Sequence, residues 1–175
     1  IRDHETADLA IQAALTGHLV FATLHTNDAA GALPRLLDMG AEPFLLASSI
    51  TAIVAQRVLR RLDEKNKTAY TPDAAVLNDI KANLGTIMPA DFKGQLYKGV
   101  PTPENNNSGY KGRVAIFEVL PVSEKIARLI LERSPASEID KQARAEGMIS
   151  MKQDGYLKVV EGQTSIEEVL RVAQE

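Results

Sequence analysis

Two of the chain's three histidines, His18 and His25, stand at the two ends of an apolar run in TGHLVFATLHTND, residues 16–28. Histidine can act as a general acid or base or bind a metal ion. If residues 18–26 form one strand, the odd separation of the two histidines places their rings on opposite faces. Binding of one metal ion by both rings is therefore not expected, and no HExxH spacing elsewhere in the chain suggests a zinc site.

His25 is the better candidate for chemistry, because it lies at the carboxyl end of the predicted strand, where open α/β sheets bind their ligands. Thr26, Asn27 and Asp28 follow it directly, before a predicted helix whose N-terminus would favour an anionic group such as phosphate. The alternative is that these polar residues only cap the helix and that His25 bonds a neighbouring loop. His18, at the amino end, is expected to make a structural hydrogen bond.

A cluster of arginines, Arg57, Arg60 and Arg61, ends a predicted long helix over residues 43–62. Cations at a helix C-terminus are favoured by the helix dipole, and this structural explanation needs no ligand. The functional alternative is a contact with phosphate or with another subunit.

The elements around these residues indicate an α/β protein with a mostly helical C-terminal part. The nearly all-apolar run 18–26 is typical of a central strand in a parallel sheet, and its missing neighbours are expected to precede Ile1. Asp3 is a candidate N-cap for a first helix that ends at Gly17, and Pro34 is expected to kink or restart the helix after Asp28. The predicted helices span residues 3–17, 27–40, 43–62, 74–87, 123–133, 136–147, 150–162 and 164–174, and a second strand spans residues 110–122.

Composition narrows the class of protein. The net charge of −3 gives no general reason to expect nucleic acid as a partner, and no apolar run is long enough to span a bilayer. The absence of cysteine excludes disulfides and thiolate metal sites. A chain that opens on Ile1, without methionine or a signal peptide, is expected to be a piece of a longer polypeptide.

Several long motifs, in order, resemble the C-terminal part of the motor domain of the type II secretion and type IV pilus assembly ATPases. They are the run from IRDHETADLA to AQRVLRRL over residues 1–62, GYKGRVAIFEVLPV, and GMISMKQDGYLKVVEGQTSIEEVLRV. The resemblance implies part of a RecA-like P-loop ATPase fold. It also implies a homo-hexamer that hydrolyses ATP with Mg²⁺ in the cytoplasm and acts on an inner-membrane platform protein, without inserting into the membrane itself.

The resemblance also implies roles for individual residues. IRD matches the tail of the Walker B segment, so Arg2 and Asp3 become catalytic candidates whose preceding glutamate is expected just before Ile1. TGHLVFATLHTND matches the His box, which implies that His25 and Thr26 lie near the terminal phosphate and that His18 supports them. AQRVLRRL makes Arg57 a candidate nucleotide contact.

Two departures from the family pattern stand out. Many relatives carry two CxxC zinc pairs, one after RRL and one before GYKGR, whereas this chain reads DEKNK and NNNSGYKGR there. No zinc is therefore expected, and the connection must be held by packing or be mobile. Pro34 also stands where relatives usually continue a helix.

The resulting hypothesis divides the chain into part of the ATPase core (1–62), a variable connection (63–108), and a last core strand with a helical subdomain (109–175). The fragment lacks a P-loop and is expected to be inactive alone. A non-catalytic module for oligomerisation or partner docking is the alternative, and a nucleic-acid-translocating ATPase is a weaker one.

Overall fold

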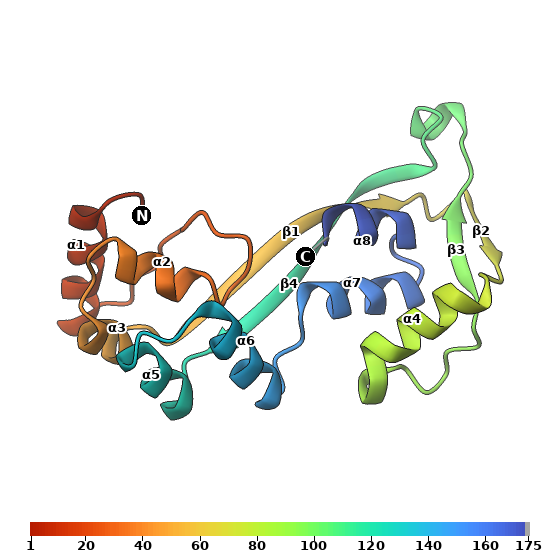
Figure 1. The fold of residues 1–175 in the computed structure, drawn as a ribbon. Helices are drawn as coiled ribbons and strands as arrows, with labels where there is room; N and C mark the ends of the chain where they lie inside the picture. The colour runs from red at the N-terminus through yellow and green to blue at the C-terminus, as the bar shows by residue number, and fades with distance from the viewer. Residues whose placement is uncertain (174–175) are drawn as a thin grey trace. The chain divides into compact units, whose positions relative to one another are not determined.

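The computed structural model describes residues 1–173, which divide into two compact units (Figure 1). The first unit consists of Ile1–Ala55 and Glu118–Ile149, and the second of Gln56–Phe117 and the chain from Ser150 onward. The described residues combine eight α-helices with four strands, so the α/β expectation is confirmed.

The first unit is built from helices around an apolar core. They are α1 (His4–Leu15), α2 (Ala32–Asp38), α3 (Pro43–Ser49), α5 (Glu124–Leu131) and α6 (Ala136–Ala145). Helix α3 packs against both α1 and α5, and α5 packs against α6. The side chains that share this core include Ala7, Ile11, Leu33, Leu46, Leu120, Ile126, Ile130 and Ile139.

The predicted start and end of α1 are confirmed. The Asp3 side chain accepts a hydrogen bond from the Thr6 backbone N–H at 2.9 Å, as an N-cap does. Gly17 follows the helix with φ +89°, a conformation that residues with a Cβ rarely adopt.

Two long strands, β1 (Ala52–Leu62) and β4 (Tyr110–Pro121), form a two-stranded sheet, and each unit contains part of both. At one end the Val122 N–H donates to the Thr51 carbonyl at 2.9 Å, and at the other the Asp63 N–H donates to the Gly109 carbonyl at 3.1 Å. The start of each strand therefore lies beside the end of the other, which makes the pair antiparallel.

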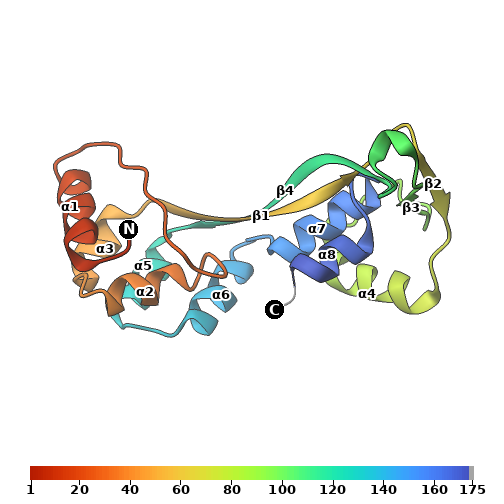
Figure 2. The same cartoon turned by 90° about the horizontal axis from the view of Figure 1, so that it is seen from above.

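The second unit adds an antiparallel hairpin, β2 (Lys67–Tyr70) with β3 (Leu96–Gly99), in which Lys67 lies opposite Gly99. It also contains α4 (Ala74–Leu84), α7 (Met151–Val160), α8 (Ile166–Val172) and two short 3₁₀ turns, η1 (Gly85–Ile87) and η2 (Pro103–Asn105). Helices α7 and α8 lie side by side in both views (Figure 2), and α4 packs against α7. Their core includes Leu59, Ile80, Leu96, Ile116, Tyr156 and Val169.

The predicted strand over residues 18–26 is wrong for this chain. Residues 18–26 carry no regular secondary structure, and Leu19 and Phe21 are 84% and 88% exposed. A strand needs a hydrogen-bonded neighbour, and within residues 1–173 β1 pairs with β4 and β2 with β3. The residue types favour a buried strand, but the described chain supplies nothing to cover it.

The predicted helix over residues 43–62 is also wrong. Helix α3 ends at Ser49, and residues 52–62 form strand β1. Burial alternates along the first part of β1, with Ile53, Ala55 and Arg57 on the more buried side. Pairing with β4 therefore overrides an apolar spacing that also fits a helix.

The helix predicted from Asn27 begins instead at Ala32. Pro34 then falls in the first turn of α2, where its missing N–H leaves no intrahelical bond unmade. The remaining predicted elements form as strand β4 and helices α4 to α8, with residue 174 of the last prediction outside the described residues.

Candidate functional site

The two histidines of the His-box segment have different surroundings. The His18 Nδ1 lies 2.9 Å from the Thr16 hydroxyl oxygen, a local hydrogen bond at the end of α1. His25 is exposed, and the residue after it, Thr26, is half-buried. The imidazole of His25 is therefore accessible to a ligand.

The turn after His25 is held by side-chain contacts. The Thr26 hydroxyl donates to the Asp28 carbonyl at 2.9 Å, and the Asp28 carboxylate accepts the Gly31 N–H at 2.6 Å. The Ala29 N–H donates to the buried carboxylate of Glu118, on β4, at 2.8 Å. Because α2 has seven residues and begins only at Ala32, the helix N-terminus predicted directly after Thr26 does not lie there.

Residues 1–3 lie close to the same segment. The Ile1 nitrogen donates to the Thr23 carbonyl at 2.5 Å. Arg2 and Asp3 are exposed, and the hydrogen bonds from Thr6 lower the pKa of the Asp3 carboxyl. An open depression of about 780 Å³ lies between α1 and the extended segment, and it is lined by Ile1, Thr6, Leu9, Ala10, Val20, Phe21, Ala22 and Thr23.

The three arginines lie on a strand, so the helix-dipole explanation for them is wrong. Alternation along β1 places Arg57 and Arg61 on one side and Arg60 on the other. Arg60 and Arg61 form ion pairs with Glu168 and Glu64, at 2.5 Å and 3.5 Å. Arg57 is half-buried and belongs to the second unit, whereas the other predicted site residues belong to the first.

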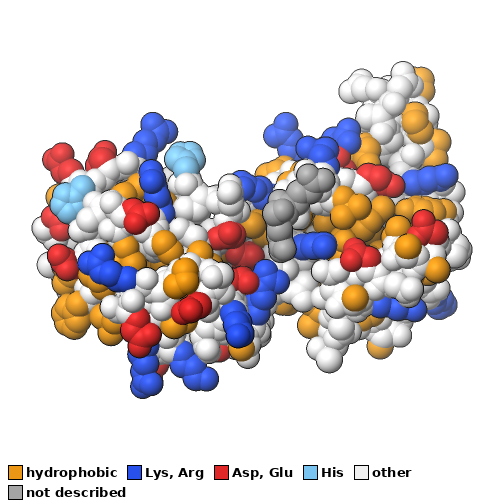
Figure 3. Space-filling view, viewed as in Figure 1, with side chains coloured by type: hydrophobic (Ala, Val, Ile, Leu, Met, Phe, Trp, Pro, Cys, Tyr) orange, Lys and Arg blue, Asp and Glu red, His pale blue; other side chains and the backbone are white. Residues whose placement is uncertain are grey.

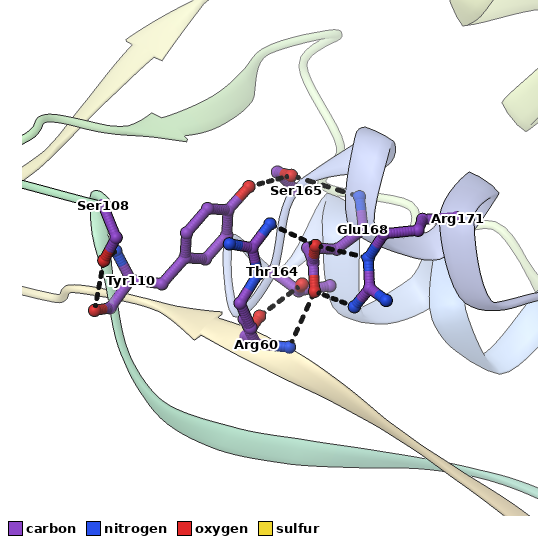
Figure 4. A network of polar contacts seen from close by, with 7 residues as sticks. All are labelled: Arg60, Ser108, Tyr110, Thr164, Ser165, Glu168 and Arg171. Carbon is purple, nitrogen blue, oxygen red and sulfur yellow. Dashed lines mark hydrogen bonds and ion pairs between the residues drawn. The ribbon is translucent and has the colours of Figure 1, made fainter.

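Arg60 belongs to a network of polar contacts around Glu168, which sequence reasoning missed (Figure 4). The Glu168 carboxylate, 1% exposed, accepts from the Arg60 backbone N–H and guanidinium and from the guanidinium of Arg171. The Arg60 guanidinium also lies 4.2 Å from the ring centroid of Tyr110, whose hydroxyl is 2.7 Å from that of Ser165. These contacts, which we call the Glu168 clamp, tie β1 and β4 to α8.

The Glu168 carboxyl is strongly acidic. Burial alone would raise its pKa, but the hydrogen bonds from Arg171 and Arg60 outweigh burial and lower the pKa to about 2. The charged form of Glu168 is thus the form that the native structure stabilises.

The connection between residues 63 and 108 is held by a second polar cluster. The buried Asp63 carboxylate accepts from the side-chain amides of Asn66 at 2.9 Å and Asn105 at 3.1 Å. The Asn105 side-chain oxygen Oδ1 in turn accepts the backbone N–H groups of Thr102 and Gly109. A Cβ on Gly99 would lie 2.1 Å from the Gly109 carbonyl oxygen, so the close backbone approach there requires glycine.

This Asp63 cluster is where the sequence predicted only packing or mobility. The Asx residues that precede turns in DEKN and ENNNSG were the available signal. Within residues 1–173 no group of three or more His, Asp or Glu side chains is placed to hold a metal ion. In the same range, no helix has the length and apolar character needed to cross a membrane.

The fold is that of part of the RecA-like secretion ATPases. It matches the pilus retraction motor PilT with bound ADP at a TM-score of 0.63 and 23% identity, over 100% of this chain and 38% of that one. It matches the ATPase DotB of Legionella pneumophila at a TM-score of 0.61 and 21% identity, over 99% of this chain and 36% of that one.

The chain belongs to the family of type II/IV secretion system proteins, whose model matches residues 1–171. It is 44% identical over 170 residues to the type IV pilus assembly ATPase PilB of Thermus thermophilus, covering 97% of this chain and 19% of that protein. It is also 44% identical to the type II secretion system protein E of Xanthomonas campestris, covering 100% of this chain and 30% of the relative. The chain thus spans less than a third of the length of these two relatives.

Proposed function

We propose that this chain is the C-terminal part of an ATP-hydrolysing motor for type II secretion or type IV pilus assembly. The motor would be a homo-hexamer on the cytoplasmic side of the inner membrane that acts on a platform protein. Its relatives carry the names of such ATPases, and the resemblance of the residues 1–62 motifs points the same way.

The observation that carries the proposal is the accessible His25 at the end of an apolar segment that the described chain leaves uncovered. Leu19 and Phe21 are among the most exposed apolar side chains, and the depression beside them is apolar. Burying a phenylalanine is worth about 1.5–3 kcal/mol, so a segment of this kind favours a covering partner. We propose that residues preceding Ile1 in the full-length protein supply the neighbouring strands.

The residues present fit contact with phosphate rather than a complete nucleotide site. His25 and Thr26, both in the first unit, supply a ring nitrogen and a hydroxyl, whereas the nucleotide contact of Arg57, in the second unit, stays a prediction. The Asp3 and Asp28 carboxylates bond backbone N–H groups, and the sequence contains no GxxxxGK[ST] loop. Bound ATP with Mg²⁺ would supply the phosphoanhydride bond that is cleaved. The P-loop that holds its phosphates would have to come from outside this chain. Arg2 and Asp3 would form the end of the Walker B segment. His18 would hold the start of the His-box segment through its hydrogen bond with Thr16.

The test is ATP turnover by the full-length protein in Mg²⁺. Replacement His25→Ala is expected to lower kcat at least tenfold, because an electrostatic contact to the reacting phosphate is lost. The 175-residue chain alone is expected to show no turnover. Full activity of the His25→Ala protein would contradict the assignment, and absence of a P-loop from the full-length sequence would favour a non-catalytic docking module.

A further inference from the structure

Glu118 is a buried acid that the proposed site does not yet use. It lies on β4 and is 4% exposed, whereas its strand neighbours Phe117 and Val119 are 42% and 47% exposed. Its Oε1 accepts the N–H of Ala29, a residue 89 positions earlier in the chain, at 2.8 Å. Ala29 is fully buried, so this N–H depends on a protein acceptor rather than on water.

The Ala29 N–H is the middle of the turn that follows His25 and Thr26. Thr26 and Asp28 make contacts within the turn, whereas Glu118 reaches it from a distant strand. Hydrogen bonds to a carboxylate are about twice as strong as those between neutral groups, and a buried partner left unpaired is costly. Glu118 therefore fixes the turn to β4.

We propose that Glu118 is a positioning residue for the phosphate contact made by His25 and Thr26. This inference rests on the proposed function, because it assigns Glu118 to the same site. Glu118 meets this turn at the Ala29 backbone N–H, so its role in the site would be exerted through the turn, by holding the chain that directly follows His25 and Thr26.

The test uses ATP turnover of the full-length protein with Glu118→Ala, His25→Ala and the double variant. Glu118→Ala is expected to lower kcat about tenfold with less than about a threefold change in KM, because misplacement acts mainly on the reacting geometry. In the His25→Ala background the same change is expected to lower kcat by less than about twofold, since the group that it positions is already gone.

A matched buried acid and a conservative variant separate positioning from loss of stability. Glu168→Ala removes the buried glutamate of the other unit. Any factor by which it lowers kcat is expected to multiply with the factor lost in His25→Ala. Glu118→Gln keeps an acceptor oxygen and is expected to stay within about threefold of the wild-type kcat. If Glu118→Ala does not fold, Glu118→Met, of similar size and without an acceptor, takes its place.

The possible outcomes separate a failure of the positioning role of Glu118 from a failure of the proposed function. If Glu118→Ala and His25→Ala each lower kcat and their effects multiply, the positioning role is overturned while the proposed function stands. If Glu118→Gln loses as much as Glu118→Ala, the positioning role is overturned too. If His25→Ala leaves turnover unchanged, the proposed function fails and the inference fails with it.

Discussion

The His-box segment and the Glu168 clamp are opposite kinds of structure within one chain. In the segment, Leu19 and Phe21 are more than four-fifths exposed although their types favour a core. In the clamp, a carboxylate whose type favours water is 1% exposed and has four hydrogen bonds from two arginines. Apolar residues lie outside in one region, and a charge lies inside in the other.

The difference teaches where each region's partners are. Glu168 meets Arg60 and Arg171, which this chain supplies, so the desolvation of its charge is offset. The apolar side chains of residues 18–24 need neighbours that cover them on both sides. The described chain instead leaves Leu19 and Phe21 exposed. Figure 3 shows that hydrophobic side chains also reach the surface elsewhere on the face that it draws. We infer that the clamp is complete within this chain, whereas the His-box segment is completed by residues outside it.

Within the 175-residue chain, the largest effect is expected from breaking the clamp. Glu168→Ala should lower the free energy of unfolding by about 2–3 kcal/mol, because it leaves the Arg60 N–H without its acceptor, whereas both guanidinium groups can turn to water. Chemical denaturation of the chain measures this loss. Glu167→Ala, one position away and exposed, is the control and should stay within about 0.5 kcal/mol.

Acid should weaken the same clamp. Since the folded pKa of Glu168 is about 2 and its ordinary value is 4.5, the stabilisation is fully present above about pH 4.5 and is lost as the pH falls toward 2. Stability measured across this window should therefore fall with decreasing pH. A Glu168→Gln chain should lose less over the same window, and an unchanged slope would show that Glu168 is not held as a charge.

The Asp63 cluster is expected to give a smaller loss. Asp63→Ala should lower the free energy of unfolding by about 1–2 kcal/mol, because the buried amide of Asn105 loses an acceptor. It should also speed hydrogen exchange in residues 99–109. Glu64→Ala, which removes the ion pairs of an exposed carboxylate to Arg61 and Lys67, should change stability by less than about 1 kcal/mol. Equal losses from the two substitutions would refute the role given to Asp63.

Within the 175-residue chain, the smallest effect is expected at the exposed apolar segment. Phe21→Ser should change the stability of the 175-residue chain by less than about 0.5 kcal/mol, because the ring is already in water. In the full-length protein the same substitution should cost about 3 kcal/mol or more, if the ring is buried there. Thermal and chemical denaturation of both proteins give the comparison, and equal small losses in both would contradict the inferred covering.

Elements with local signals could be predicted from the sequence. Four of the helices begin at an N-cap that stands directly before the helical segment in the sequence. These caps are Asp3 for α1, Ser123 for α5, Ser150 for α7 and Ser165 for α8. The class of fold and the family also followed from the motifs. By contrast, the sequence predicts a helix where β1 forms, because the apolar spacing fits both periods and pairing with β4, some fifty residues later, decides between them.

The site was only partly predictable for the same reason. The chemistry of His25 and Thr26 is visible in the sequence, but the contact from Glu118 to Ala29 spans 89 residues and the one from Asn105 to Asp63 spans 42. No local sequence pattern predicts contacts between residues so far apart in the chain. The sequence identifies Arg57, Arg60 and Arg61 as a group. Which of them joins the Glu168 clamp depends on the alternation of side chains along β1, a strand that the sequence predicts as a helix.

The most direct test of the account is amide hydrogen exchange at residues 19–24, compared between the 175-residue chain and the full-length protein. If the segment becomes a strand between neighbours from the rest of the protein, its amides should exchange at least about a hundredfold more slowly in the full-length protein. The amides of α8 should exchange at similar rates in both, since the Glu168 clamp is complete in this chain. Equally fast exchange of residues 19–24 in both proteins would contradict the claim that this half of the site is completed from outside the chain.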